Sequence, residues 1–418
     1  MRIAFLTSEY VTEASFAGGL AQYLGRVTSG LVARGHDVEV FVIAESCETV
    51  EHQGVIVRRV PAKKWLPLRI ANIACKAMHR RRLCKSQLAC STALGLYHAF
   101  RQRASAARFD IVQAASWLGT GYFAAKNPWT PVVVRASSFE PVLFPHRGQS
   151  LSLDETIYCR FETAAMRRAA AVYTPSRFLA GEIRKATGVQ PHVVNPPFCA
   201  ALGRAREDVG AHDGRSDYVM YFGKVAKYKG SGLLAEAIEP LLTQTEQLHL
   251  VIAGPSEDDP EAQRLLSLAE RFPASVRYVG SRDHDTVMRL VGGARVVVLP
   301  SLMDNLPNTC LEAMAMGKVV VGPNGVSFDE LITDGQSGIL FQTGNPLSLR
   351  QGILQAWHMT EDRRRAMGRA ACMRIDQMAP ETALRDLECF YEGVIENHAQ
   401  SGGTRRPVGR VAKECSLR

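Results

Sequence analysis

Two carboxylates stand eight positions apart in the stretch SLMDNLPNTCLEAMAMG (301–317): Asp304 lies before a polar turn, and Glu312 lies in the apolar run after it. The preceding segment ARVVVLP is typical of a buried strand, and open α/β sheets bind ligands at the carboxyl ends of their strands. We expect a helix to begin at the turn, capped by Asn308 or Thr309. Its free N–H groups would suit a phosphate.

Such a helix start would give each acid a role. A carboxylate repels nearby phosphates, so it is expected here only if it accepts hydrogen bonds from another part of the ligand. The two ribose hydroxyls of a nucleotide are such a group. Glu312, placed in about the first turn, would hold the ribose, and Asp304 would reach hydroxyls of whatever the far phosphate carries. The spacing alone slightly favours a plainer interpretation, in which Glu312 complements the helix dipole and Asp304 caps a turn.

A group of cations opens the C-terminal half in YFGKVAKYKG (221–230), where Lys224, Lys227 and Lys229 follow a strand-like run. Breaking a sugar–phosphate bond leaves a diphosphate whose added charge must be stabilised by a divalent metal or by fixed cations. Lys224 and Lys229 would supply that charge, so we expect no metal, whereas Lys227 is interpreted as an ordinary exposed side chain.

Strand-like apolar runs alternate with helical stretches in two successive series along the 418 residues. Runs without polar alternation, each followed by a helix, indicate parallel sheets covered on both faces. Two such series predict an α/β protein with two doubly wound, Rossmann-like domains and a cleft between them. The strands are expected at 2–8, 37–44, 110–116, 131–138, 170–176 and 192–195, and then at 218–223, 248–254, 276–280, 294–300, 318–322 and 338–341.

These series predict the domain boundaries. We expect an N-terminal domain at 1–197, a linker at 198–217 and a C-terminal domain at 218–378. Residues 379–397 should form a helix that crosses back to the N-terminal domain. The last segment, 398–418, has no apolar periodicity and is expected to be a disordered basic tail.

The net charge of +9 is concentrated in two places. Residues 58–108 contain 13 Lys or Arg and no Asp or Glu, and residues 404–418 add a net +4. Apolar positions at helical spacing among these cations predict a basic, amphipathic helical insert at 60–108. It would be either a solvated cationic face or, as we favour, an interfacial helix on anionic lipid. Charge so concentrated does not indicate nucleic acid as a partner.

Other features narrow the class of protein. Ten cysteines are scattered without a C-x-x-C pair, which indicates reduced thiols and neither a disulfide framework nor a zinc site. The chain opens directly into a strand without a secretory signal, and no apolar run approaches the roughly 18 residues of a membrane span. We therefore expect a cytoplasmic protein, soluble or peripheral on the inner face of the membrane.

Several segments resemble the family 4 retaining glycosyltransferases, which share the two-domain GT-B fold. GKVAKYKG, LHLVIAGP and VVVLPSLMDNLPNTCLEAMAMGKVVVG are similar to their second domain, and TSEYVTEASFAGGLAQYLGRVTSGLVARGHDVEVF resembles their opening and that of bacterial glycogen synthases. The similarity covers most of residues 1–397 and is densest in 218–345. It implies retaining transfer, without metal or other cofactor, of a sugar from a nucleotide-diphospho-sugar to a glycan or lipid-linked acceptor in polysaccharide or glycolipid assembly.

The resemblance also implies residue roles. Glu312 matches the family acid that binds the ribose, and Asp304 replaces the Glu that contacts the donor sugar. Lys224 stands in place of the usual Arg and Lys229 matches the usual Lys, and both would contact the diphosphate. The turn whose backbone amides meet the diphosphate and the sugar is matched by Asn305, Leu306, Pro307, Asn308 and Thr309.

Two sites match the family less closely. Gly18 and Gly19 match the glycine loop near the donor phosphate and the acceptor, although a simple strand-to-helix turn explains them equally well. Family members often have a His at the position that we align with Ser137. The neighbouring Arg135 would meet an anionic acceptor or form a salt bridge under the sheet.

Alternatives remain at this level. Asp283-His284-Asp285 looks like the D-x-D metal site of the other glycosyltransferase fold, but it precedes a helix, so we expect Asp283 or Asp285 to be a cap. A nucleotide-sugar epimerase of the same shape would need acid–base residues around the sugar, and we find no such set. A non-catalytic sugar-nucleotide or membrane-binding module is suggested by the departures at Asp304 and Ser137.

Overall fold

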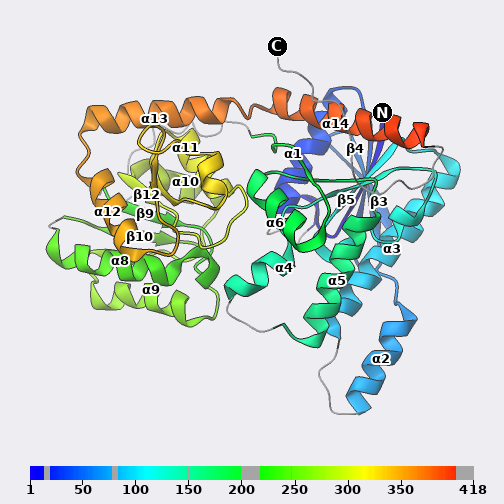
Figure 1. Cartoon of the computed structure of the whole chain (residues 1–418), viewed down its shortest axis with the longest axis horizontal. Coiled ribbons are helices and arrows are strands. Elements are labelled where there is room, and N and C mark those ends of the chain that lie inside the picture. The colour runs from blue at the N-terminus through cyan, green and yellow to red at the C-terminus, as the bar shows by residue number, and fades with distance from the viewer. Residues whose placement is uncertain (14–18, 78–82, 148–150, 199–216, 246, 402–418) are drawn as a thin grey trace. The chain divides into compact units, whose positions relative to one another are not determined.

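The computed structural model describes residues 1–13, 19–77, 83–147, 151–198, 217–245 and 247–401. The chain divides into two compact units (Figure 1). Unit 1 comprises 1–145, 149–197 and 380–418, and unit 2 comprises 146–148 and 198–379. The expected disordered tail lies almost entirely outside the described residues, as does most of the expected linker.

Unit 1 is built on an eight-stranded sheet of order β3-β4-β2-β1-β5-β6-β7-β8. Its strands are β1 (Arg2–Thr7), β2 (Asp37–Ile43), β3 (Glu48–His52), β4 (Val55–Val60), β5 (Ile111–Ala115), β6 (Val132–Arg135), β7 (Ala171–Thr174) and β8 (His192–Val193). The six strands expected from the sequence are confirmed. The sequence analysis missed β3 and β4, and β3 pairs antiparallel to β4, so the sheet is not purely parallel as expected.

Helices cover both faces of this sheet, as its apolar strands require. One face packs on α1 (Gly19–Ala33) and on α14 (Pro380–Gln400) through a core that includes Leu24, Val27, Leu387 and Tyr391. The other face packs on α3 (Cys84–Ala106), α5 (Leu153–Arg168) and α6 (Arg177–Thr187). The short α4 (Glu140–Leu143) follows β6.

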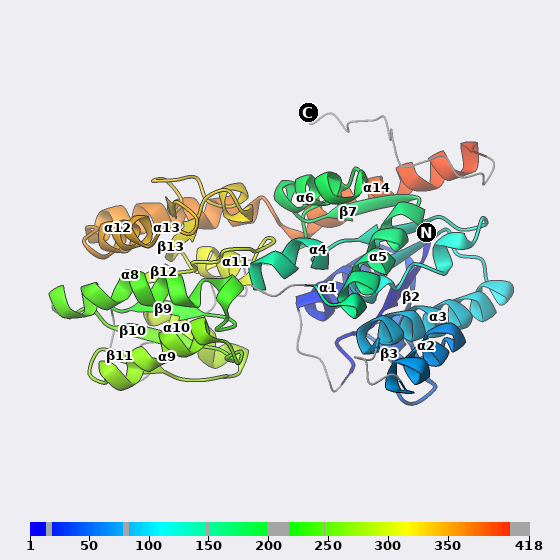
Figure 2. The ribbon, with the colours of Figure 1, turned by 60° about the horizontal axis from the view of Figure 1, so that its bottom comes forward.

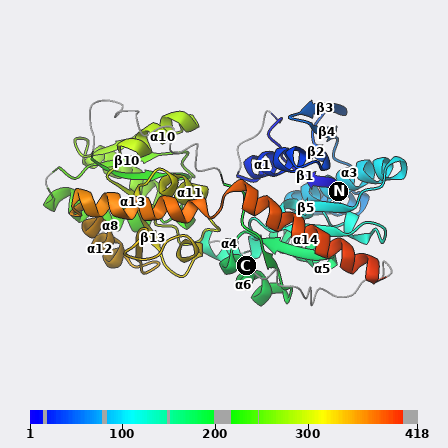
Figure 3. The same ribbon diagram turned by 90° about the horizontal axis from the view of Figure 1, so that it is seen from above.

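The last helix, α14, is fixed to unit 1 beside α1 (Figures 1 and 3). Tyr391 is fully buried and donates to the side-chain oxygen of Gln113 on β5. At the solvent side Glu388 accepts from Arg34 at 2.6 Å and lies 2.7 Å from Nε2 of His36. The hydrogen bond from Arg34 holds the pKa of Glu388 below its usual value.

The basic segment forms two different helices. The first, α2 (Leu66–Ala77), lies against the first part of α3 (Figure 2). The second, α3, is a core helix, because Leu96 and Phe100 are fully buried under the sheet. The expectation of one amphipathic insert over 60–108 is therefore wrong for α3, whose apolar residues pack inside the domain.

A buried acid forms ion pairs with three cations in and around this segment. Glu39 on β2 is fully buried, and its carboxylate lies 2.6 Å from Arg58, 2.8 Å from Arg103 and 3.1 Å from Arg2. Burial alone would raise the pKa of Glu39, but the hydrogen bonds and charges of Arg103 and Arg58 outweigh it and the pKa is lowered. Part of the charge that appears unbalanced in the sequence is thus offset in the fold.

Unit 2 has a six-stranded sheet of order β11-β10-β9-β12-β13-β14, in which all strand pairs are parallel. Its strands are β9 (Val219–Phe222), β10 (Leu250–Ala253), β11 (Val276–Tyr278), β12 (Val296–Val298), β13 (Val319–Pro323) and β14 (Ile339–Phe341). All six were expected from the sequence. The strand order reverses between β9 and β12, which makes their carboxyl ends the ligand site predicted for such sheets.

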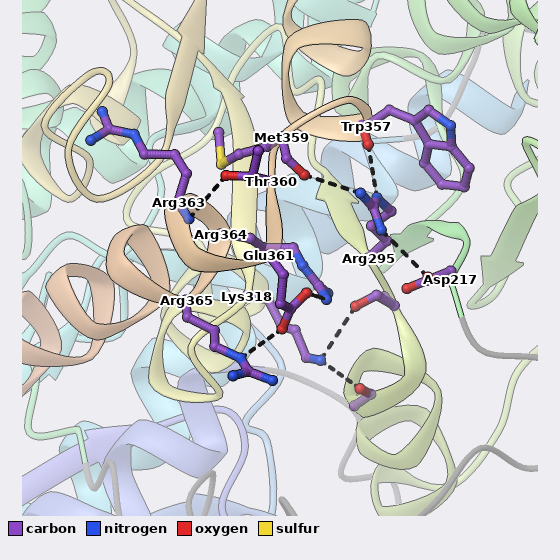
Figure 4. A network of polar contacts seen from close by, with 12 residues as sticks. Asp217, Arg295, Lys318, Trp357, Met359, Thr360, Glu361, Arg363, Arg364 and Arg365 are labelled. Carbon is purple, nitrogen blue, oxygen red and sulfur yellow. Dashed lines mark hydrogen bonds and ion pairs between the residues drawn. The ribbon is translucent and has the colours of Figure 1, made fainter.

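Helices also cover both faces of the second sheet. One face carries α8 (Ser231–Gln244), α9 (Pro260–Arg271) and α12 (Pro346–Trp357), and the others are α10 (His284–Gly293), α11 (Asn308–Ala315) and α13 (Glu361–Asp376). At the amino ends of the strands, Arg295 donates to the carbonyl oxygens of Trp357 at 2.8 Å and Met359 at 3.1 Å (Figure 4). These bonds tie the turn between α12 and α13 to β12.

We expect Glu39→Gln to lower the free energy of unfolding by about 3 kcal/mol, because it leaves three guanidinium groups beside a neutral buried side chain. Urea unfolding followed by circular dichroism measures this. Glu51→Gln on the neighbouring edge strand is the matched control, since Glu51 is exposed and no ion pair of it is found among the described residues. Equal losses in the two variants would contradict the structural role of Glu39.

Candidate functional site

The site is built where β9 and β12 end side by side. The loop after β9 leads through a short 3-10 turn (Lys227–Lys229) to Gly230, and the loop after β12 begins at Leu299. Backbone amides of Leu302 and Met303 donate to the carbonyl oxygen of Tyr228 at 2.9 and 3.2 Å. A Cβ on Gly230 would lie 1.9 Å from the carbonyl oxygen of Pro300, so only glycine allows this approach.

This approach brings two of the predicted residues together. Nζ of Lys229 lies 2.6 Å from Oδ2 of Asp304. Oγ of Ser301 donates to the same carboxylate oxygen at 3.0 Å. The two side chains are mostly buried, with exposed fractions of 26% and 12%, so the pair is partly shielded from solvent. In this arrangement the acid holds the ammonium at the carboxyl edge of the sheet.

Lys224 is placed differently. Its ammonium lies 3.1 Å from Glu257, which follows β10, and both side chains are more than one-third exposed. Asp259, two residues after Glu257, caps α9, because it accepts from the amide of Ala262 at 2.7 Å. Lys224 therefore does not join Lys229 at the Asp304 carboxylate.

The turn after Asp304 has an unusual backbone. Leu306 has a φ of 51°, in the left-handed region that a branched side chain rarely occupies. Its amide donates to Oγ of Ser327 at 2.7 Å, and that hydroxyl donates to the carbonyl oxygen of Asp304 at 3.2 Å. The amide of Asn305 donates to Oδ1 of Asp304 at 3.0 Å. Strained turns held in this way are typical of ligand sites.

Helix α11 follows directly from this turn. It begins at Asn308, its N-cap is Pro307, and no side chain caps it. The expectation that Asn308 or Thr309 caps the helix is therefore wrong, because the helix starts one residue too early for either to stand at the cap. No hydrogen-bond acceptor for the N–H groups of Asn308 and Thr309 is found within the described part of the chain, and such groups suit an anion.

Glu312 is the fifth residue of α11, at the end of its first turn and close to the expected place. Its side chain is only 15% exposed, and its carboxylate is 4.0 Å from Nδ1 of His284 at the start of α10. As expected, Asp283 caps α10 by accepting from the amide of Thr286 at 2.9 Å. Over the described residues no three His, Cys, Asp or Glu side chains lie together as a metal site.

In unit 1 the expected residues lie near the carboxyl ends of β1 and β6. Gly19 is the first residue of α1, and Gly18 lies outside the described residues. The carboxylate of Glu9 accepts from the amide of Ala21 in the first turn of α1, and burial raises the pKa of this acid. One of the N–H groups at the start of α1 is thus hydrogen-bonded to an acid of the protein itself.

Arg135 is buried on the face of the sheet that carries α1. It is 5% exposed, and its guanidinium lies 3.5 Å from the centroid of the Tyr23 ring. Among the described residues it forms no ion pair, and Nη1 has no hydrogen-bond partner. The salt bridge considered for Arg135 is therefore not found, and stacking on Tyr23 takes its place. Ser137 follows it, partly buried.

Four residues of the site were not identified from the sequence as partners of the predicted groups: Ser301, Ser327, Glu257 and His284. Ser301 acts within the loop that carries Asp304, and the other three act through contacts between segments that follow different strands. Serines and a surface acid are common in such loops, so their residue types carried no signal.

Comparison with known proteins identifies both units. A family model described as "Glycosyl transferase 4-like domain" matches residues 18–197, and one described as "Glycosyl transferases group 1" matches 216–358. An uncharacterized glycosyltransferase of Methanocaldococcus jannaschii is 25% identical over 86% of this chain and 91% of its own length. The D-inositol 3-phosphate glycosyltransferase of Streptomyces scabiei is 24% identical over 91% and 88%.

Solved structures share the fold. A sucrose-phosphate synthase from Thermosynechococcus elongatus superposes with a TM-score of 0.75 at 18% identity, over 95% of this chain and 99% of its own. Anabaena HepE in complex with UDP and glucose gives a TM-score of 0.68 at 17% identity, over 94% and 99%. Together with the two family models, these matches show that the chain belongs to the family 4-type glycosyltransferases with the GT-B fold.

Proposed function

We propose that this glycosyltransferase moves a sugar, with retention of configuration and without a metal ion, from a nucleotide-diphospho-sugar to a glycan or lipid-linked acceptor. The observation that carries the proposal is the Lys229–Asp304 pair at the reversal of strand order, beside the start of α11. A cation, helix-start amides and an acid lie together at one edge of the sheet. The cation and the amides suit a diphosphate, and the acid suits the hydroxyls of its sugar.

The donor would replace the contacts that these residues make with each other. Its diphosphate would take the ammonium of Lys229 and the amides of Asn308 and Thr309, and Lys224 would add charge by leaving the exposed Glu257. Asp304, released from Lys229, would accept from hydroxyls of the sugar. Glu312 would accept from the ribose, with His284 nearby.

In the transfer step, the bond between the sugar C1 and the diphosphate oxygen breaks, and a bond from C1 to the acceptor oxygen forms on the same face. The acceptor proton passes to the departing phosphate oxygen. Lys229 and the amides stabilise the negative charge that grows on the diphosphate. This stabilisation is strongest in the transition state, so it lowers the activation barrier. The chemistry then needs no protein base.

The comparisons support parts of this proposal. HepE has been solved with UDP and with UDP-glucose, which supports a nucleotide-sugar donor here. The matching family models name glycosyl transferases, which favours transfer over the nucleotide-sugar epimerase and the non-catalytic module.

We also propose that the protein works in the cytoplasm, peripherally on the inner face of the membrane, where a lipid-linked acceptor would be presented. Over the residues described, no helix is both long and apolar enough to cross a bilayer. The proposal of surface attachment is supported by the cations of the basic segment that the fold leaves without partners.

We expect Lys229→Ala and Glu312→Ala each to reduce transfer about 100-fold or more, because each removes a contact to the leaving group or the ribose. The assay is release of nucleoside diphosphate from the best donor found by screening nucleotide-sugars. Lys227→Ala is the neighbouring control and should remain near wild type. Near-normal rates in folded Lys229 and Glu312 variants would refute the assignment.

We expect Asp304→Asn to bind free UDP about threefold more tightly while transferring sugar at least about tenfold more slowly, because the substitution frees Lys229 and removes an acid near the phosphates. Calorimetric titration and the transfer assay measure the two effects. Asp258→Asn, at an exposed acid of the same unit, should change neither. Weaker UDP binding in Asp304→Asn would contradict the proposed exchange of partners.

We expect transfer to persist in EDTA, because Lys229 and backbone amides would provide the charge that a metal provides elsewhere. The initial rate is compared in untreated enzyme, in EDTA and after Mg²⁺ or Mn²⁺ is added back. A loss of activity that either ion restores would count against this mechanism.

A further inference from the structure

Helix α2 has two apolar faces, and only one of them is covered. Trp65, just before the helix, and Leu68 pack against a small core under α3. Asn72 accepts from the amide of Leu83 at 2.5 Å and so fixes the same face. The opposite face carries Leu66, Ile70 and Ile73, at intervals of four and three residues. These side chains are 61%, 59% and 63% exposed.

Other exposed apolar side chains lie at the same end of unit 1. Leu88 on α3 and Leu151 and Leu153 at the start of α5 are exposed. Asp154 joins these two helix starts, because it accepts from the amides of Lys85 at 2.8 Å and Ser86 at 2.9 Å. Of the ten large exposed apolar residues found among the described residues, six thus belong to α2, to α3 and to the start of α5, which packs on α3. Such clustering marks an interaction surface.

The cations around α2 differ from those elsewhere in the basic segment. Arg58 and Arg103 are paired with Glu39, Arg59 with Glu13 and Glu48, and Lys85 with Glu140. In contrast, Lys63, Lys64 and Arg69 are exposed, and no ion pair of theirs is found within the described residues. The fold therefore neutralises the cations near the core and leaves those beside the apolar face of α2 free.

A pocket of about 520 Å³ lies between the segment after β4, which leads into α2, and the second half of α3. Its lining includes Lys63, His98 and Arg101, and no carboxylate belongs to it among the residues described. Burial, and then the positive charges of Lys63 and Arg101, lower the pKa of His98. The pocket has the size and charge to receive a phosphate-bearing headgroup.

We infer that this end of unit 1 docks on an anionic lipid surface, with Leu66, Ile70 and Ile73 entering the interface and Lys63, Lys64 and Arg69 contacting headgroup phosphates. In Figure 1, α2 extends from the lower margin of unit 1, and only its inner side meets α3. An outward apolar row bordered by unpaired cations is the pattern of an interfacial helix. The inference names the surface for the proposed lipid-linked acceptor and rests on that part of the proposed function.

Vesicle sedimentation of the full chain tests the docking. Vesicles of phosphatidylcholine with about one-third phosphatidylglycerol should bind the protein, and phosphatidylcholine alone should bind it at least about tenfold less, because each cation near the surface contributes about fivefold. Ile70→Glu with Ile73→Glu should reduce binding at least about tenfold. Leu347→Glu, at a leucine of unit 2 that is also 61% exposed, should leave binding unchanged.

Reversing the charges beside α2 provides a second test of the docking. Lys63→Glu with Lys64→Glu and Arg69→Glu should abolish the preference for phosphatidylglycerol, and high salt should weaken binding of the wild type. Donor hydrolysis without vesicles should be the same in all these variants, which separates a failure of docking from a failure of the catalytic proposal. Thermal melts confirm that each variant is folded.

Three outcomes would overturn the inference: no binding to anionic vesicles, equal binding to neutral ones, or equal loss in the Leu347 control. Sedimentation velocity tests whether a second copy of the chain, instead of a lipid surface, binds the apolar row. A dimer that Ile70→Glu dissociates, without vesicle binding by the wild type, would assign the apolar row to self-association instead.

Discussion

The close approach of two loops at the carboxyl ends of β9 and β12 determines what unit 2 can do. The strands are neighbours only because the strand order reverses between them, and Gly230 lets the following backbone touch Pro300. As a result Lys229 and Asp304, 75 residues apart in sequence, meet at 2.6 Å. Opposite charges held this way are stable without a ligand and are ready to exchange partners with a diphosphate and its sugar.

The surrounding structure supports this arrangement by fixing backbones rather than side chains. Leu306 is held in a left-handed conformation by Ser327, and α11 starts without a side-chain cap. Both features cost local stability, and the second leaves the N–H groups of Asn308 and Thr309 without an acceptor in the described part of the chain. Regions that bind ligands commonly combine strain with unsatisfied donors, because the ligand then completes the hydrogen bonds.

Charge is used differently in unit 1. Glu39, inside the sheet, pairs with Arg2, Arg58 and Arg103, so part of the charge of a segment without acids is offset in the folded chain. Among the described residues, Lys63, Lys64 and Arg69 remain unpaired beside α2, next to an exposed apolar row. A count of charges along the sequence therefore overstates the basic surface but correctly indicates the region in which it lies.

The sequence by itself determined the fold class and nearly all of the strands, because buried parallel strands need continuous apolar runs that no other element in this chain imitates. It missed β3 and β4, and in β4 Arg58 and Arg59 interrupt the apolar pattern to pair with acids. It also identified Lys229 and Asp304 as site residues, but it did not predict that they contact each other.

Only the tertiary structure decided which of these residues meet. It paired Lys229 with Asp304 but Lys224 with Glu257, stacked Arg135 on Tyr23 and added Ser301 and Ser327 to the site. It likewise separated α3, a core helix, from α2, although both are basic. The physical reason is the same throughout. Apolar periodicity is local and can be read along the chain, whereas contacts between polar side chains depend on which strand ends and helices the fold brings side by side.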